Sequence, residues 1–111
     1  ILINNAGFIV PNSLSNHATS DELRTIDVNL KGVFLCTIAA HKNNPNNLKI
    51  INIGSSAGTK PRGTWGAYCA TKAALIILTQ SKILGQLLAV LQPGAQRLHG
   101  MQVKFLYLVN P

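Results

Sequence analysis

The sequence predicts an α/β fold in which strands of a parallel sheet alternate with helices, and two observations lead to this prediction. Short apolar runs of strand length alternate along the chain with longer stretches whose apolar residues recur at helical spacing. Breaks rich in Asn, Pro and Gly separate them. The resulting order, β-α-β-α-β, predicts parallel strands joined by right-handed crossovers. Because both crossovers run the same way along the sheet, we expect both helices on one face.

The first half of the chain holds one strand and one helix. "ILINNAG", residues 1–7, is typical of a short strand that runs into a turn. A helix is predicted over residues 18–42, because the stretch begins with a capping-box pattern, Thr19 and Glu22, and ends before "NNPNN". Its apolar residues recur at helical spacing at Leu23, Ile26, Leu30, Val33, Phe34 and Ile38.

The second half repeats this alternation. A buried strand is predicted over residues 49–54, within "LKIINIGSSAG", and a loop containing Pro and Gly follows. A helix is predicted from about Gly66 to Val90, then a break at "QPGAQ", then a last strand "QVKFLYLV" at residues 102–109. The near-continuous apolar runs in these strands are typical of parallel strands that are covered on both faces.

Composition and charge argue for a folded domain and against several classes of partner. Hydrophobic residues make up 47% of the chain, and ten Lys and Arg against three acids give a net charge of +7. The basic residues are scattered from Arg24 to Lys104, so we expect no nucleic-acid surface. No apolar stretch reaches the length of a membrane span. Cys36 and Cys69 have no metal ligands at suitable spacing, so we expect no metal site and interpret both cysteines as small core residues. Two cysteines alone predict no disulfide framework.

A tyrosine and a lysine stand four positions apart in "GAYCATKAAL", residues 66–75. On a helix Tyr68 and Lys72 lie on one face, a turn apart, and can act on the same atom. An ordinary tyrosine titrates near about 10, and a nearby cation stabilises the phenolate. Ser55 ends the preceding strand, where open α/β sheets bind ligands. Each residue also has an ordinary structural explanation: Tyr68 and Lys72 as a surface-helix pair, Ser55 as a turn or cap.

Four segments in register carry a resemblance to a known family. Ser55 and the Tyr-x-x-x-Lys pair of Tyr68 and Lys72, with "NNAG" at 4–7 and "DVNLKG" at 27–32, resemble the signature of the classical short-chain dehydrogenases/reductases. The resemblance implies a Rossmann-like, doubly wound parallel sheet. It also implies an oxidoreductase that interconverts an alcohol and a carbonyl compound with NAD or NADP.

The resemblance implies a role for each matching residue. Tyr68 would pass a proton to or from the substrate oxygen while hydride moves to or from the nicotinamide. Ser55 would hydrogen-bond the same oxygen, and Lys72 would bind the nicotinamide ribose and stabilise the phenolate. Asn29 would hold a water that connects the lysine to solvent, or would simply bond its own backbone. The cofactor would lie along Asn4, Ala6 and Gly7, with Tyr68 and Lys72.

We expect residues 1–111 to be the central part of one NAD(P)-binding domain. The Gly-rich phosphate turn and first strands would precede Ile1, and the substrate loop would follow Pro111. The resemblance covers roughly residues 1–80, and the segment after Lys72 is longer than the family pattern. A cytoplasmic location is expected.

The substrate class stays open. "GTWGAY", with Trp65 before the tyrosine, resembles the branch that contains sepiapterin and benzil reductases, which reduce carbonyls flanked by another carbonyl. Trp65 could equally pack the loop, and a 3-oxoacyl reductase or polyol dehydrogenase is also possible.

Three functions compete for this chain. The first is part of an NAD(P)-dependent oxidoreductase acting on a small molecule. The second is a catalytically inactive fragment that keeps only its helical association surface, since the two long helices form the subunit interface in the resembling family. A homo-oligomer is expected through these helices. The third is a basic nucleic-acid-binding module. We expect the isolated chain to be oligomeric or poorly soluble, and inactive.

Overall fold

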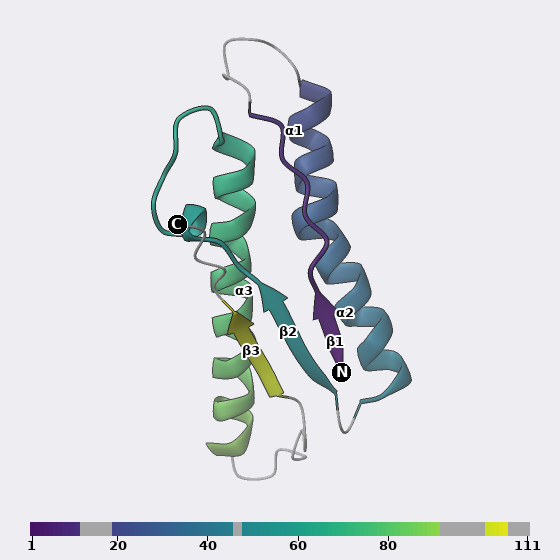
Figure 1. The fold of residues 1–111 in the computed structure, drawn as a ribbon. Helices are drawn as coiled ribbons and strands as arrows, with labels where there is room; N and C mark the ends of the chain where they lie inside the picture. The colour runs from purple at the N-terminus through teal and green to yellow at the C-terminus, as the bar shows by residue number, and fades with distance from the viewer. Residues whose placement is uncertain (12–18, 46–47, 92–101, 107–111) are drawn as a thin grey trace.

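A three-stranded parallel sheet forms the centre of the structure, a computed structural model that describes residues 1–11, 19–45, 48–91 and 102–106. The strands are β1 (Leu2–Asn4), β2 (Lys49–Ile53) and β3 (Gln102–Leu106). β2 lies between the other two (Figure 1), with Ile50 opposite Leu2 on one side and opposite Val103 on the other. The predicted parallel α/β arrangement is therefore confirmed.

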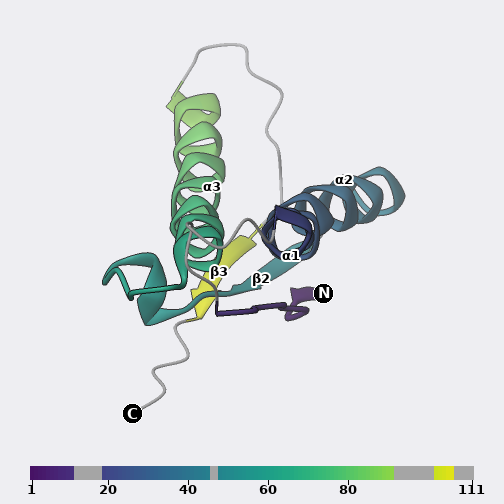
Figure 2. The same cartoon turned by 90° about the horizontal axis from the view of Figure 1, so that it is seen from above.

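The helices cover one face of this sheet. One continuous rod is built from α1 (Thr19–Ile26), the π-helical turn η2 (Asp27–Lys31) and α2 (Gly32–Asn43). The other helices are the short 3-10 helix η3 (Ser56–Gly58) and the long α3 (Gly66–Leu91). Seen from above, the rod and α3 lie on the same side of the strands (Figure 2). Both crossovers thus run as expected, and the described residues supply one helical layer of a doubly wound sheet.

The predicted elements occur, with two additions: the 3-10 helix η3, in the loop expected after β2, and a π turn. The helix expected over residues 18–42 contains the π turn η2, which carries no sequence signature because π pairing differs from α pairing by one residue. The break expected at residues 92–96 and the end of the last strand, residues 107–109, lie outside the described residues.

The apolar core lies between the sheet and the rod. Leu48 and Ile50 are its buried centre, and Leu2 and Ala40 pack against them. Strand side chains alternate between faces, so Leu2 and Ile50 point toward the helices while Ile3 and Ile51 point the other way. The side chain of Ile3 is 57% exposed, which leaves the second face of the sheet uncovered in the described structure.

The rod buries two polar side chains and exposes several apolar ones. Thr25 and Asn29 are buried, whereas among the apolar residues used to predict the helix only Val33 is buried. The exposed apolar side chains of the rod are Leu23, Ile26, Phe34, Leu35 and Ile38. Cys36 is exposed as well, so the prediction that it is a core residue was wrong; it lies on the outward face of α2. Cys69 is half-buried.

A chain of hydrogen bonds crosses the covered side of the sheet. Asn4 donates from Nδ2 to Asn52 Oδ1 at 2.8 Å and lies 3.5 Å from Thr37 Oγ1. Asn52 donates in turn to Thr79 Oγ1 at 3.0 Å. The two asparagines stand opposite each other in neighbouring strands. Satisfied buried polar contacts of this kind specify one arrangement, here of α2, β1, β2 and α3.

Candidate active site

A cavity of about 390 Å³ opens at the carboxyl ends of β1 and β2. This is the edge at which open α/β sheets bind their ligands. Its walls come from the loop after β1, the end of β2, the loop after η3 and the first turns of α3. The lining residues are Asn5, Gly7, Ile9, Ile53, Gly54, Ser55, Ser56, Arg62, Trp65, Tyr68 and Lys72. Ser55 and the pair of Tyr68 and Lys72, predicted from two separate stretches of the sequence, therefore share one cavity.

Tyr68 and Lys72 are held on the cavity by the first two turns of α3. Lys72 Nζ lies 5.7 Å from the centroid of the Tyr68 ring and donates a hydrogen bond to Ile53 O at 2.9 Å. Only 4% of Lys72 is exposed, and this burial lowers the pKa of its ammonium group from the ordinary value of 10.5. The bond to Ile53 fixes the amine at the end of β2, beside the phenol.

The hydroxyl group of Ser55 caps a helix and also keeps a proton that it can donate to a ligand. Its Oγ accepts a hydrogen bond from Ala57 N at 3.2 Å and so caps η3. This agrees with the interpretation of Ser55 as a turn or cap residue. A hydroxyl has one proton to donate in addition to its acceptor sites, and no described residue accepts that proton from Ser55. The proton can therefore be donated to a ligand oxygen in the cavity.

A close backbone contact presses η3 against α3. A Cβ added at Gly58 would stand 2.8 Å from the carbonyl carbon of Lys72 and 2.9 Å from its oxygen. Any side chain at this position would force the two elements apart. The glycine thus sets the distance between the segment that carries Ser55 and the helix that carries Tyr68 and Lys72.

Asn29 is fully buried in the π turn, where it joins three segments. Its Oδ1 accepts from Phe8 N at 2.7 Å, and its Nδ2 donates to Phe8 O at 2.9 Å and to Thr71 Oγ1 at 3.3 Å. Both amide protons of the side chain are therefore used within the protein. A water held by this residue would have to bind another of its atoms, and the predicted water-holding role stays a prediction.

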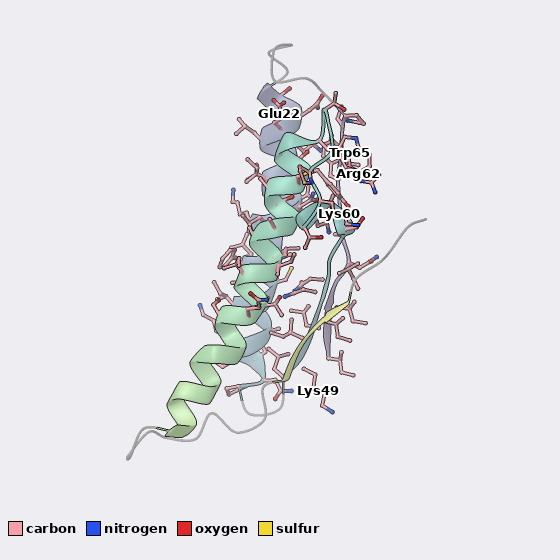
Figure 3. All side chains as sticks on the ribbon, turned by 90° about the vertical axis from the view of Figure 1, so that its left-hand side faces the viewer. Glu22, Lys49, Lys60, Arg62 and Trp65 are labelled. Carbon is pink, nitrogen blue, oxygen red and sulfur yellow. The ribbon has the colours of Figure 1, made fainter. Side chains whose placement is uncertain are left out.

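The loop between η3 and α3 brings a tryptophan and an arginine to the cavity. The Trp65 ring meets the Tyr68 ring edge to face, with centroids 5.7 Å apart and an interplanar angle of 89°. The Arg62 guanidinium lies over the other ring, with Cζ 5.2 Å from the Trp65 centroid. Figure 3 shows Arg62, Trp65 and Lys60 together at the end of the molecule opposite Lys49.

The residues predicted along the cofactor divide between the cavity and the interior. Gly7 lines the cavity, Ala6 is exposed beside it, and Asn4 is bonded to Asn52 below the strand ends. Sequence reasoning missed Asn5, although alternation along an extended chain would place it opposite to Asn4. It also missed Arg62, whose only signal is its place in the loop between the predicted serine and tyrosine.

Two kinds of feature are not found in the described part of the chain. No group of three or more His, Cys, Asp or Glu side chains there could hold a metal ion. Among the described helices, none combines the length and the apolar character needed to cross a bilayer.

The amino-acid sequence of the chain is similar to that of known proteins. The family model described as short chain dehydrogenase matches residues 1–85. Benzil reductase ((S)-benzoin forming) of Bacillus cereus is 37% identical over 83 residues, covering 71% of this chain and 33% of the relative. NADP-dependent (R)-specific alcohol dehydrogenase of Lentilactobacillus kefiri is 37% identical over 86 residues, covering 75% of this chain and 34% of the relative. The chain therefore spans about a third of the length of these curated relatives.

A solved structure extends the likeness to nearly the whole chain. The gluconate 5-dehydrogenase of Burkholderia cenocepacia J2315, in complex with NADP and tartrate, matches with a TM-score of 0.81 and 30% identity. The match covers 97% of this chain and 39% of that structure. The sheet and its covering helices are thus similar in arrangement to part of a dehydrogenase of known structure.

Proposed function

Because the chain belongs to the short-chain dehydrogenase family, we propose that it is part of an NAD(P)-dependent oxidoreductase that interconverts an alcohol and a carbonyl compound. One observation carries the proposal: Ser55, Tyr68 and Lys72 line a single cavity at the carboxyl ends of two parallel strands. Hydroxyl, phenol and ammonium groups together can bind a carbonyl oxygen and move a proton to it.

The cavity walls fit the nicotinamide end of the cofactor. Gly7 is exposed, and a Cβ built on it meets nothing closer than Asn5 O at 3.9 Å, so the backbone there is open to a flat ring. Gly7, Asn5 and Lys72 would hold the nicotinamide and its ribose. When bound, the cofactor supplies or takes up the hydride at the substrate carbon. NAD and NADP both satisfy these contacts.

The chain's own residues account for the fate of the substrate oxygen. In the reducing direction Tyr68 donates its proton to that oxygen, and Ser55 donates a hydrogen bond to it. Lys72 places a positive charge beside the phenolate that Tyr68 becomes. Asn29, bonded to Phe8 and Thr71, fixes the loop after β1 against the helix that carries the tyrosine. We assign catalysis to Ser55, Tyr68 and Lys72, with Asn29 as a positioning residue.

The relatives support a carbonyl substrate with a neighbouring carbonyl group. The Bacillus cereus relative is a benzil reductase, and the edge-to-face contact of Trp65 with Tyr68 places an aromatic wall beside the proton donor. A 3-oxoacyl or polyol substrate stays possible. A cytoplasmic location stays a prediction.

The test is steady-state reduction by the complete protein that contains this chain, with benzil and other carbonyl compounds and either dinucleotide. Tyr68→Phe should lower turnover by about 10²–10⁴-fold, because only the transferable proton is lost. Its dinucleotide affinity should stay close to that of the wild type. If Tyr68→Phe kept most of the wild-type rate, the assignment of Tyr68 as the general acid/base would be wrong.

A second role, association, is favoured by the apolar side chains on the outer face of the rod. Leu35 and Ile38 are 59% and 50% exposed on α2, and Ile77 is 64% exposed on α3. Apolar surface of this kind on two helices typically meets a partner, and we propose a second copy of the protein. This surface would serve both a working enzyme and an inactive fragment.

The association role is tested by sedimentation velocity on the complete protein. Leu35→Glu with Ile38→Glu should shift the protein to a smaller species, because two charges would be desolvated in the interface. Lys42→Glu, at an exposed site near the end of the same helix, is the control and should leave the mass unchanged. An unchanged mass in the double variant would place the interface elsewhere.

A further inference from the structure

The cavity carries a charged group that the proposed reaction does not use. Its lining residues, all within the described chain, include two cations, Arg62 and Lys72, and no acid. Lys72 is buried, bonded to Ile53 O and adjacent to the proton donor. Arg62 comes from the loop that follows Ser55, and the proposed reaction assigns it no role. A positively charged wall without a carboxylate favours an anionic ligand group.

The guanidinium is oriented by aromatic contacts. The Cζ atom of Arg62 lies over the Trp65 ring, and Trp65 in turn contacts the ring of Tyr68. A guanidinium that lies over an indole keeps the N–H groups at its edge free, and this edge matches a carboxylate with two parallel hydrogen bonds. No described carboxylate forms an ion pair with Arg62, and no described atom accepts a hydrogen bond from its side chain.

The backbone fixes Arg62 relative to Trp65. Trp65 N donates to Arg62 O at 3.3 Å, which closes a tight turn, and Trp65 O accepts from Cys69 N at 2.8 Å at the start of α3. Within the turn Thr64 has φ 62°, a left-handed conformation that a β-branched residue adopts only where the surroundings require it. The cation and the tryptophan are thus presented to the cavity as one unit.

We propose that Arg62 determines specificity by binding a carboxylate on the carbonyl substrate, so that the preferred substrate class is a small oxo acid. The proposal rests on the proposed function and adds the substrate class to it. The reacting carbonyl would lie against Ser55 and Tyr68, and the carboxylate would lie against the edge of the guanidinium. A 2-oxo acid with an aromatic group also satisfies the preference for a neighbouring carbonyl.

The test compares phenylglyoxylate with its methyl ester in the complete protein, because the two differ in charge at one position. The wild type should prefer the acid, and Arg62→Ala should lower kcat/KM for the acid by about tenfold, as expected for a lost hydrogen bond to a charged group. The same variant should change kcat/KM for the ester by no more than about twofold. Lys60→Ala removes an exposed cation of the same loop that does not line the cavity, and should change neither value.

Binding and turnover separate this proposal from the proposed function. The dissociation constant of phenylglyoxylate, measured by calorimetry, should rise by a similar factor in Arg62→Ala whether or not the compound is reduced. Binding that depends on Arg62 without any reduction would remove the proposed function and keep the inference. An equal loss for acid and ester, an effect confined to the KM of the dinucleotide, or a wild-type preference for the ester would overturn the inference.

Discussion

Several residues of the candidate site already have partners within the protein, and these partners decide which atoms are left for a ligand. Ser55 uses an acceptor site of its hydroxyl on Ala57 N and keeps its proton. Lys72 gives one N–H to Ile53 O, which leaves two protons of the ammonium group for other acceptors. Asn29 keeps neither amide proton. The free donors are thus those that a carbonyl oxygen and a ribose hydroxyl would need.

Burial of Lys72 should make stability depend on pH in a defined direction. Burial lowers the pKa of Lys72 in the folded state below its ordinary value of 10.5. Between the lowered pKa and 10.5 the unfolded state binds more protons than the folded state, so the free energy of unfolding rises with pH in that window. Lys72→Met lacks this rise. The stability of the wild type relative to Lys72→Met should therefore increase as pH rises toward 10.5, as measured by urea unfolding.

The exposed Lys60→Met variant is the control for this measurement, because it removes a lysine from a solvated position. The free energy of unfolding of the wild type, taken relative to that of Lys72→Met, should not stay constant or fall as pH rises. Either result would contradict the burial of the Lys72 ammonium. At neutral pH Lys72→Met should also weaken both dinucleotide binding and turnover, since the same amine is proposed to serve both.

The contact between η3 and α3 leaves no room for a side chain at Gly58. Gly58→Ala would place a methyl group 2.8 Å from the backbone of Lys72. Relief of this overlap must separate the two elements, so we expect a loss of about 1–3 kcal/mol in the free energy of unfolding. We also expect reduced turnover, since Ser55 would move away from Tyr68.

A second glycine offers a matched control for the Gly58 variant. A Cβ added at Gly63 has no neighbour within 4 Å, and Gly63 is exposed in the same connection to α3. Gly63→Ala should change the free energy of unfolding by less than about 0.5 kcal/mol. If urea unfolding gave equal changes in the free energy of unfolding for the two variants, the close approach at Gly58 would not contribute to stability.

Most elements could be predicted from the sequence because each has a local signal. The apolar run of β2 and the capping pattern at Thr19 both act over a few residues. The direction in which a helix faces is not local. The rod shows apolar residues to the surface and buries Thr25 and Asn29, so its periodicity predicted a helix but not its buried face.

The site was predictable only in part for the same reason. Ser55, Tyr68 and Lys72 stood out by their spacing, and the cavity brings them together. Arg62 and Asn5 have no spacing signal, because a loop can direct a side chain anywhere until its turn geometry is known. The bond between Asn4 and Asn52 depends on strand register, which joins residues 48 positions apart.

At the largest scale, the described part of the chain is a sheet with helices on one side, as Figure 2 shows. The uncovered face carries Ile3, and Ile1 at the edge strand is 84% exposed. Apolar strand faces normally pack against a second layer. The 111-residue chain by itself should therefore self-associate or precipitate, and should bind neither NADH nor NADPH at micromolar concentration.

Sedimentation equilibrium and calorimetry on the isolated chain check this expectation. Ile3→Lys with Ile51→Lys should increase the soluble monomer fraction, because the charges would occupy the open face of the sheet. Ile77→Lys, on the outside of α3, should have a smaller effect if the sheet face dominates. A wild-type chain that is a soluble monomer and binds a dinucleotide tightly would contradict the expectation.

The central claim is that Tyr68 delivers the proton while the nicotinamide reduces the substrate carbon in this cavity. The most direct measurement is transfer of deuterium to a carbonyl substrate in the complete protein, from a reduced dinucleotide that carries deuterium at both C4 positions of its nicotinamide, followed by mass spectrometry of the alcohol. The wild type should place one deuterium on the carbinol carbon, and Tyr68→Phe should do so about 10²–10⁴-fold more slowly at equal dinucleotide occupancy. An alcohol without the label, or a phenylalanine variant that transfers deuterium at the wild-type rate, would contradict the claim.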